Sequence, residues 1–419
     1  MSIVKRTKKK GYTLLRKSEK YFGTDMVYLT KGSFWLFAVQ IFSGLASFIM
    51  LIAFTHYVSK EVYGTYRYVL SFLGLLTVFT LPGLNTAINR AIARDFDGSL
   101  KEGLRQKVLW GFLGMAVSFC ISIYYYINGN DTLAISFIML GLFLPIIESV
   151  KLYRIALCAK KLFKREAIYE IMFRAVSLIV MVIAIIFTNS VFHILLVFLG
   201  IQAIVKGFFL YRVMRTLPLN ERVEKGTVKY AKHLSFMNVI AVLASQLDKI
   251  LIFHYLGAVE LAVYSVAVTP IDQLRGVVGN IRTLAFPKFS NQSLHDIKKT
   301  LLNKIKKLEL VVLVIVVVYI VLAPVFFKFF IPQYLDSVIY SQVLAVYLLF
   351  SPRSLITTVL NAQKRVRELY IIRIVGPAMR IALVFPLLKY WGLWGAVFSV
   401  LLADLFLYVF YVIIFRRIK

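Results

Sequence analysis

The sequence predicts an all-α polytopic membrane protein of about twelve transmembrane helices, arranged as two six-helix bundles. Two observations lead to this fold class: 60% of the 419 residues are apolar and only 17% are charged, and the apolar residues fall in long runs separated by basic segments. A soluble globular protein is roughly 45–50% apolar and about 25% charged. So many apolar side chains need lipid around them as well as a protein core.

The apolar runs predict the individual spans, because a helix needs about 20 apolar residues to cross a hydrocarbon core of roughly 30 Å. The runs that meet this length lie near 33–54, 67–89, 108–127, 132–150, 169–188, 190–211, 234–254, 262–284, 309–330, 338–360, 369–388 and 391–415. The eighth is the weakest, since Asp272, Arg275 and Gly276 interrupt it. An even number of spans is expected to place both chain ends on one side of the membrane.

The basic residues predict which side that is. The sequence has 50 Lys and Arg against 20 Asp and Glu, a formal net charge of +30. Most of the basic residues lie in the tails 1–31 and 416–419 and in the alternate loops on the same side, whereas the opposite loops contain only Lys60, Lys328 and Lys389. Basic loops stay cytoplasmic, so both termini are expected there, close to anionic membrane lipids. This explanation of the charge leaves no reason to expect a nucleic-acid partner.

The loops and motifs argue against an enzyme. No loop is long enough to hold a folded catalytic domain, and neither GxxxxGK[ST] nor HExxH occurs, so ATP hydrolysis and zinc chemistry lack their residues. The two cysteines and five histidines show no metal-ligand spacing. We therefore expect a secondary transporter without a metal site or a cofactor, other than a coupling ion.

The spans divide into two halves with a shared pattern. The polar linker 212–233 separates an N-terminal bundle at 32–211 from a C-terminal bundle at 234–415. The sequence reads HYVSKEVYGTY at 56–66 and HYLGAVELAVY at 254–264, each directly after the first span of its half. Six spans per half predict a parallel repeat, related by a pseudo-two-fold axis along the membrane normal. In transporters of this kind the substrate binds near the midplane, between the halves.

Several segments carry a resemblance to a known family. The first half contains YGTYRYVLSFLGLLTVFTLPGLNTAINRAIAR at 63–94, and the second contains LDKILIFHYLG at 247–257, FPKFS at 286–290 and WGLWGAVFSVLLAD at 391–404. With these segments the chain resembles the polysaccharide-biosynthesis, O-antigen-type flippases of the multidrug/oligosaccharidyl-lipid/polysaccharide exporter superfamily. The resemblance implies translocation of undecaprenyl-diphosphate-linked oligosaccharide from the inner to the outer leaflet by alternating access. It also implies a bacterial or archaeal cytoplasmic membrane and other polysaccharide-assembly proteins as partners.

Charged residues inside the spans are the candidates for substrate binding. Each would cost about 2.5–3.5 kcal/mol at mid-membrane, so each should face a watery cavity, form an ion pair or reach the interface. A lipid diphosphate explains the cations, because the planar fork of Arg binds phosphate oxygens bidentately. Arg373 and Arg380 lie two helical turns apart on one face of the eleventh span. The candidate substrate-binding residues are Arg373, Arg380, Arg275, Lys249, Arg174 and Arg90.

Three acidic residues in the spans are candidates for ion coupling: Asp248, Asp404 and Glu148. A buried carboxyl could exchange H⁺ or Na⁺ during the transport cycle, and a structural ion pair is the alternative for Asp248 and Glu148. Two other functions stay open at this point. One is a multidrug/cation antiporter of the same superfamily, and the other is a non-transporting membrane scaffold within a polysaccharide assembly complex.

Overall fold

The computed structural model describes residues 26–290, 294–363 and 365–417, and over these residues the chain is helical, without strands. The first half contains α2 (Met26–Tyr57), α3 (Lys60–Leu76), η1 (Thr77–Thr80), α4 (Leu84–Ala93), α5 (Ser99–Ile127), α6 (Asp131–Val150), α7 (Leu152–Ala159), α8 (Phe163–Phe187) and α9 (Val191–Thr216). The second half contains α10 (Thr227–Leu256), α11 (Ala258–Ser290), α12 (Leu294–Phe330), η2 (Pro332–Tyr334), α13 (Ser337–Ala345), η3 (Val346–Arg353), α14 (Ser354–Ala362) and α15 (Val366–Arg417). The prediction of an all-α fold is confirmed.

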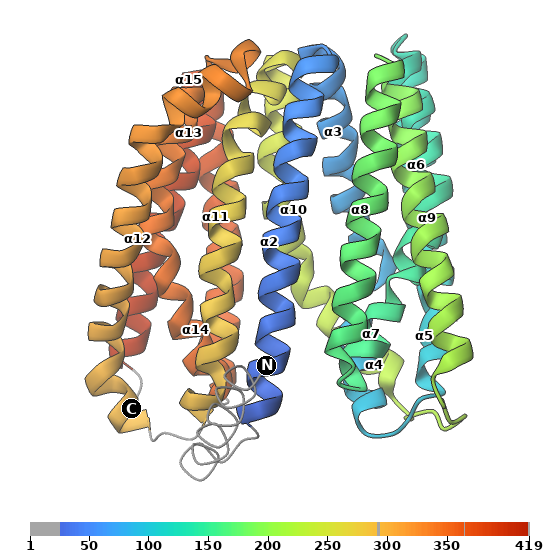
Figure 1. Cartoon of the computed structure of the whole chain (residues 1–419), viewed down its shortest axis with the longest axis vertical. Helices are drawn as coiled ribbons and strands as arrows, with labels where there is room; N and C mark the ends of the chain where they lie inside the picture. The colour runs from blue at the N-terminus through green and yellow to red at the C-terminus, as the bar shows by residue number, and fades with distance from the viewer. Residues whose placement is uncertain (1–25, 291–293, 364, 418–419) are drawn as a thin grey trace, which may run out of the picture.

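The number of membrane crossings agrees with the sequence. Within the described residues, ten segments are long and apolar enough to cross a membrane. The last of them, Arg367–Arg417, is two helices joined at Gly392, whose backbone is non-helical (φ 56°, ψ −135°). The charged helix α11 is not among the ten, yet it runs the length of the bundle (Figure 1). Dividing α15 and adding α11 gives the twelve crossings that the sequence predicts.

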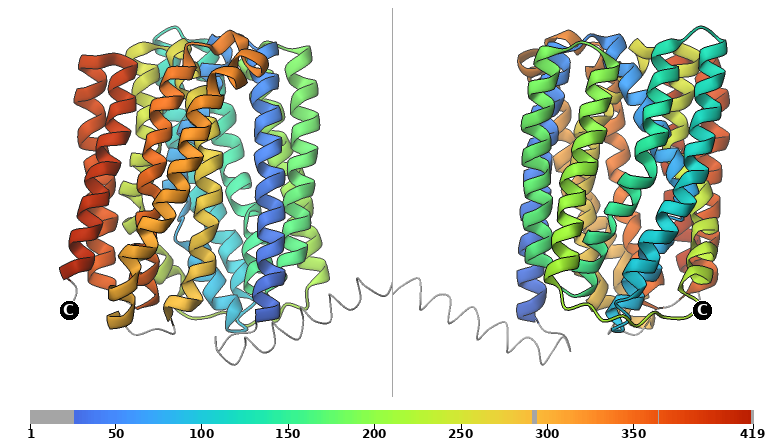
Figure 2. Two further views of the ribbon diagram at one scale, coloured as in Figure 1. Left: turned by 60° about the vertical axis from the view of Figure 1, so that its left-hand side comes forward. Right: turned by 90° about the vertical axis from the view of Figure 1, so that its right-hand side faces the viewer.

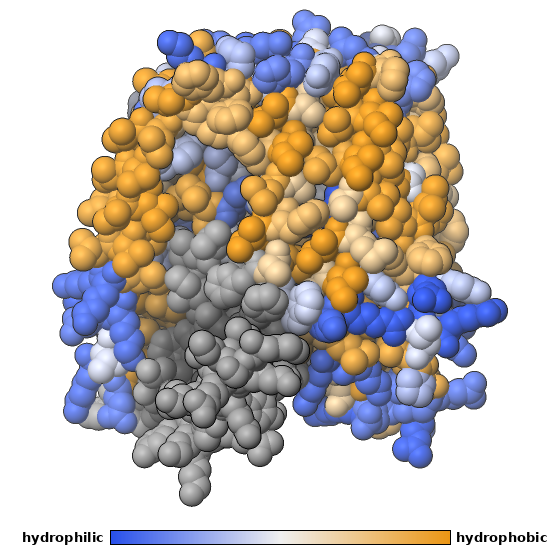
Figure 3. Space-filling view, in the orientation of Figure 1, coloured by the Kyte–Doolittle hydropathy of each residue, from blue (hydrophilic) through white to orange (hydrophobic). Residues whose placement is uncertain are grey.

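The surface and the chain ends fit a multi-pass membrane protein. Figure 3 shows apolar side chains over the middle of the helices on one face, with hydrophilic side chains at both ends of the bundle. The helix α2 begins and α15 ends at the same end of the bundle (Figures 1 and 2). Apolar side chains on this face suit contact with lipid tails, and the polar groups lie at the two ends of the bundle, where water can reach them.

The two halves meet along α3, which packs against both α10 and α11. Glycines allow this close approach: a Cβ on Gly64 would lie 1.8 Å from the carbonyl oxygen of Ala258, the first residue of α11. At the other end of the same seam, the amide of Gly83 donates to the hydroxyl of Ser235 on α10 over 2.9 Å. The helix α3 thus occupies the space between the halves, and backbone contact joins it to the second half.

The connection between the halves is shorter than the sequence indicates. The helices α9 and α10 extend to Thr216 and from Thr227, so only ten residues of the expected linker 212–233 are non-helical. Asn220 in this connection accepts a hydrogen bond from the amide of Asp97 (3.1 Å) and donates one to the carbonyl oxygen of Asp95 (2.8 Å). These contacts fix the connection to the loop between α4 and α5.

Candidate functional site

A polar cavity lies within the second half, between α10, α11, α15 and the segment α13–η3. Its first chamber has a volume of about 190 Å³ and is lined by polar groups that include Ser245, Asp248, Lys249, Tyr264, Asp272, Arg275, Tyr347 and Arg380. Its second chamber, of about 220 Å³, adds Arg353, Asp404 and Tyr411. The chambers share Ser245, Arg275, Arg380 and Val400, so they lie side by side and are treated as one site. Figure 3 shows hydrophilic side chains inside a recess on this face, beside α11.

The first chamber is organised around the carboxylate of Asp248 on α10. One oxygen, Oδ2, accepts hydrogen bonds from Nη2 of Arg380 on α15 (3.0 Å) and from the hydroxyl of Tyr264 on α11 (2.9 Å). The other oxygen accepts from the amide of Lys249 at 2.9 Å. The Asp248 side chain is only 5% exposed, whereas that of Arg380 is 30% exposed. A buried carboxylate with a cation and two further donors is well compensated.

The second chamber is organised around an ion pair between Arg353 and Asp404, in which Nη2 of Arg353 bonds Oδ1 of Asp404. Arg353 lies at the end of η3, and its Nη1 also donates to the main-chain carbonyl oxygens of Asp404 (3.1 Å) and Phe350 (3.3 Å). The guanidinium lies 5.6 Å from the ring centroid of Tyr411. These contacts tie η3 to α15, because they involve the backbone as well as the side chain of the acid.

Two cations in the cavity have no carboxylate of the described chain within 4 Å: Lys249 and Arg275. Arg275 lies over the ring of Tyr347, 5.4 Å from its centroid. Together with the paired residues, the cavity lining contains the four cations Lys249, Arg275, Arg353 and Arg380 and the three acids Asp248, Asp272 and Asp404. The site therefore has an excess of positive charge, which would attract an anion.

The comparisons with known proteins agree with this architecture. The family model described as polysaccharide biosynthesis protein matches residues 29–294, more than half of the chain. The chain belongs to the polysaccharide biosynthesis protein family. A comparison with curated proteins gives no match.

Solved structures similar to this polysaccharide biosynthesis protein include transporters of the MOP superfamily. An inward-facing multidrug resistance transporter of the MATE family matches with a TM-score of 0.63 at 12% identity, over 92% of this chain and 98% of that one. An outward-facing MATE-family multidrug resistance transporter matches with a TM-score of 0.57 at 13% identity, over 92% and 94%. A MOP-superfamily transporter from Pyrococcus furiosus, described as having a binding pocket of reverse polarity, matches with 0.55 at 14%, over 93% and 95%. At these identities the likeness shows the fold alone.

Three of the predicted substrate-binding residues come together in this family member's cavity: Lys249, Arg275 and Arg380. Arg373 does not line either chamber and is exposed. It shares a helix face with Arg380, but seven residues correspond to about 10 Å along a helix axis. That distance places Arg373 beyond the chambers, nearer the end of the bundle where α15 begins.

The other two predicted substrate-binding residues, Arg174 and Arg90, lie in the first half, and each is close to a glutamate. Arg174 forms an ion pair with Glu170 on its own helix, over 3.3 Å. Arg90 lies 3.9 Å from Glu224 in the connection between the halves, so it lies close to the linker rather than to the cavity. The structure places both residues in the first half, apart from the chambers.

Glu148, a predicted coupling residue, lies in a buried cluster of the first half. Its carboxylate is 3.4 Å from the ammonium of Lys107 and also bonds Lys151. The Lys107 side chain is only 1% exposed, although its position beside a basic loop indicates a solvated residue.

Among the described residues, no three His, Cys, Asp or Glu side chains gather as they would around a metal ion.

Sequence reasoning missed Arg353 as a part of the site. Arg353 counts with the basic loop that follows the tenth span, but it is buried against Asp404. Its neighbour Pro352 lies inside η3, and this irregular segment keeps Arg353 at the depth of the cavity. A Pro-Arg pair within an apolar run is the signal that could have identified it.

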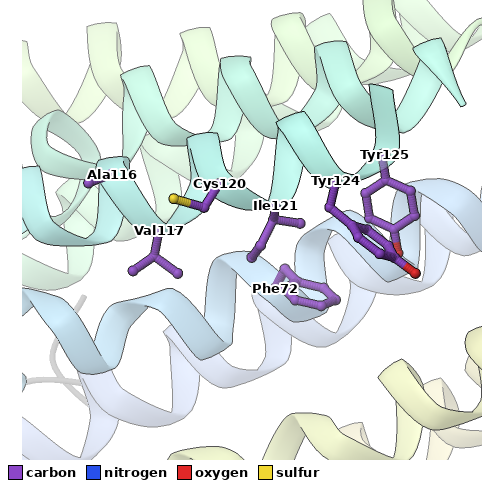
Figure 4. Close-up of a pocket in the computed structure, with 7 residues that line it drawn as sticks. All are labelled: Phe72, Ala116, Val117, Cys120, Ile121, Tyr124 and Tyr125. Atoms are coloured by element: carbon purple, nitrogen blue, oxygen red, sulfur yellow. The ribbon is translucent and has the colours of Figure 1, made fainter. Parts of the chain in front are cut away.

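A larger pocket, which is apolar, lies elsewhere in the described part of the chain, between α3 and α5 of the first half. It has a volume of about 570 Å³, and its wall is formed by Phe72 of α3 and by residues 116–125 of α5. Figure 4 shows Phe72 facing Ile121 and Tyr124 across the groove, with Cys120 beside them. The groove lacks charged residues, so it does not resemble the polar site of the second half.

Proposed function

We propose that this protein is a flippase that moves undecaprenyl-diphosphate-linked oligosaccharide from the inner to the outer leaflet of a bacterial or archaeal cytoplasmic membrane. The halves 32–211 and 234–415 would move against each other in alternating access, with both termini in the cytoplasm. The observation that supports this best is the polar cavity of the second half, which contains four cations against three acids. Membership in the polysaccharide biosynthesis protein family supports the class of cargo.

The arrangement of the cations suits a diphosphate. Lys249 and Arg275 have no carboxylate partner in the described chain, and Arg380 lines both chambers. A diphosphate that enters the cavity can therefore bind cations without first separating every ion pair. The paired acids Asp248 and Asp404 keep the empty cavity from carrying the full charge of its arginines. Asp248, Asp404 and Glu148 stay the proposed ion-coupling residues, with H⁺ or Na⁺ as the ion.

Reconstitution tests this function. Proteoliposomes are loaded with a fluorescent undecaprenyl-diphosphate oligosaccharide, and an added glycosidase reports the sugar that reaches the outer leaflet. We expect vesicles with protein to expose sugar faster than empty vesicles, and equal rates would refute the flippase and favour a scaffold. Export of an organic cation from the same vesicles, without any movement of the lipid-linked sugar, would favour the multidrug antiporter.

Replacement of Arg275 by Ala tests the cavity itself. A hydrogen bond to a charged group contributes about 1.5–3 kcal/mol, so we expect the apparent affinity for the lipid-linked sugar to fall by roughly 10- to 140-fold. Arg105→Ala is the matched control, because Arg105 is an exposed arginine on α5, outside the cavity. Equal transport by the two variants would rule out the cavity as the diphosphate site.

A further inference from the structure

The guanidinium of Arg380 stands where the two chambers meet, and one of its N–H groups is bonded to Asp248. An arginine has five N–H donors, so most of the donors of Arg380 point away from that bond. The Arg380 side chain lines the cavity and is 30% exposed. Arg380 can therefore contact an anion in either chamber, and an anion that bonds Nη2 of the guanidinium together with a second N–H group would take the one donor that now binds Asp248.

The ion pair between Arg380 and Asp248 has fewer contacts than the ion pair between Arg353 and Asp404. Arg353 holds Asp404 through a carboxylate oxygen and through the main-chain carbonyl oxygen. The contact between Arg380 and Asp248 is a single bond of 3.0 Å between two side chains from helices far apart in the sequence. The pair at Asp248 can open without breaking any backbone contact, and the pair at Asp404 cannot.

The charged and titratable groups around Asp248 and around its neighbours Lys249, Tyr264 and Arg380 come from α3, α10, α11, η3 and α15. They are Arg67 of α3, Lys249 of α10, Tyr264, Asp272 and Arg275 of α11, Tyr347 of η3, and Arg380 and Asp404 of α15. The cations in this set are the groups that a phosphate would attract. Once these cations bind an anionic ligand, their positive charge is neutralised and no longer stabilises the buried carboxylate of Asp248.

We propose that an anionic diphosphate displaces Asp248 from Arg380 and that Asp248 then takes up one proton from the cavity. This rests on the proposed function, because it takes the ligand to be a lipid diphosphate. The diphosphate bonds two N–H groups of Arg380, the Asp248–Arg380 bond breaks, and a proton from water binds Oδ2 of Asp248. The neutral acid keeps its contact with the Tyr264 hydroxyl, which lies 2.9 Å from Oδ2.

The physical reason is the cost of a buried charge. Asp248 is 5% exposed, and removal of one partner from a buried ion pair leaves an uncompensated charge that is strongly unfavourable. Protonation removes that charge, since burial disfavours the ionised form of a carboxyl. Binding of the ligand together with one proton then changes the net charge of the cavity by one unit less than the negative charge of the ligand alone. Anion loading and proton loading thus become one event.

The test measures protons bound per ligand bound. Full-length protein in detergent is titrated with farnesyl diphosphate in weak buffer with a pH-indicating dye, and binding is measured in parallel by calorimetry. We expect the wild type to take up about one proton more per bound ligand than Asp248→Asn, in which the amide cannot be protonated. The proton change of the ligand itself is common to both proteins and cancels. The affinity of the wild type should also weaken as pH rises, by up to about tenfold per pH unit, and that of Asp248→Asn should follow the ligand alone.

Glu166→Gln is the matched control, because Glu166 is a buried acid whose Oε1 lies 2.5 Å from Nε of Arg154 in the first half, away from the cavity. We expect this variant to take up protons as the wild type does. An infrared band of a protonated carboxyl should appear on ligand addition to the wild type, which needs no variant to fold. Binding without proton uptake by the wild type would overturn the coupling and leave the flippase function standing. Failure of farnesyl diphosphate to bind would overturn both.

Discussion

A methyl group on Gly64 should open the seam between the halves at the end where α3 begins. The Cβ of an alanine there would lie 1.8 Å from the carbonyl oxygen of Ala258, whereas ordinary contact begins at 3.4 Å. The helices α3 and α11 must therefore separate by about 1.6 Å, and overpacking of this kind costs about 1–3 kcal/mol. A cost of that size lowers the population of the closed seam by roughly 5- to 140-fold.

Pulsed electron resonance between spin labels can measure this separation. Labels at Glu61 and Leu335, which are exposed near this seam in the first and second half, report the distance after Cys120 and Cys158 are replaced by serine. We expect Gly64→Ala to move the distribution to longer distances and to slow transport. Gly200→Ala is the control, because its Cβ would meet no atom within 4 Å. Equal distributions for the two alanine variants would refute the reasoning.

Two further predictions concern the first half and the connection between the halves. Glu148→Gln removes the counter-charge of the fully buried Lys107 and should destabilise the protein by about 3–5 kcal/mol, seen as a lower unfolding temperature. Lys151→Ala, at a side chain 40% exposed, should change the unfolding temperature little. Similar unfolding temperatures for the two variants would contradict this prediction. Asn220→Ala removes the hydrogen bonds that fix the connection between the halves and should speed proteolysis there, and Glu221→Ala, an exposed neighbour, is the comparison that should behave as wild type.

The pairing of charges lowers the repulsion between the cations of the cavity. Asp248 and Asp404 each neutralise one arginine from another part of the chain, while Lys249 and Arg275 have no carboxylate partner among the described residues. A cavity with only cations would repel itself in a low dielectric, and a cavity with every cation paired would bind an anion weakly. The mixture suits a site that must both load and release its cargo.

The sequence predicted the twelve crossings because length and hydropathy of a run decide whether a helix can span the bilayer. It also identified Lys249, Arg275 and Arg380 as candidates, because a charged side chain inside a span is energetically costly and therefore indicates a functional site. It misjudged Lys107 and Arg353 because both lie beside basic loops, where composition indicates solvent. Depth in the bundle depends on where a helix bends, as at η3, and composition does not show that.

What the sequence by itself determined is therefore the class of protein, the number of crossings, the family and the presence of embedded cations. Only the tertiary structure decided which charges meet: Asp248 bonds Arg380, 132 positions away in the chain, and not its neighbour's ammonium. The reason is geometric. Adjacent side chains on a helix point about 100° apart, so partners come from other helices, and their rotation and depth are set by packing across the whole bundle.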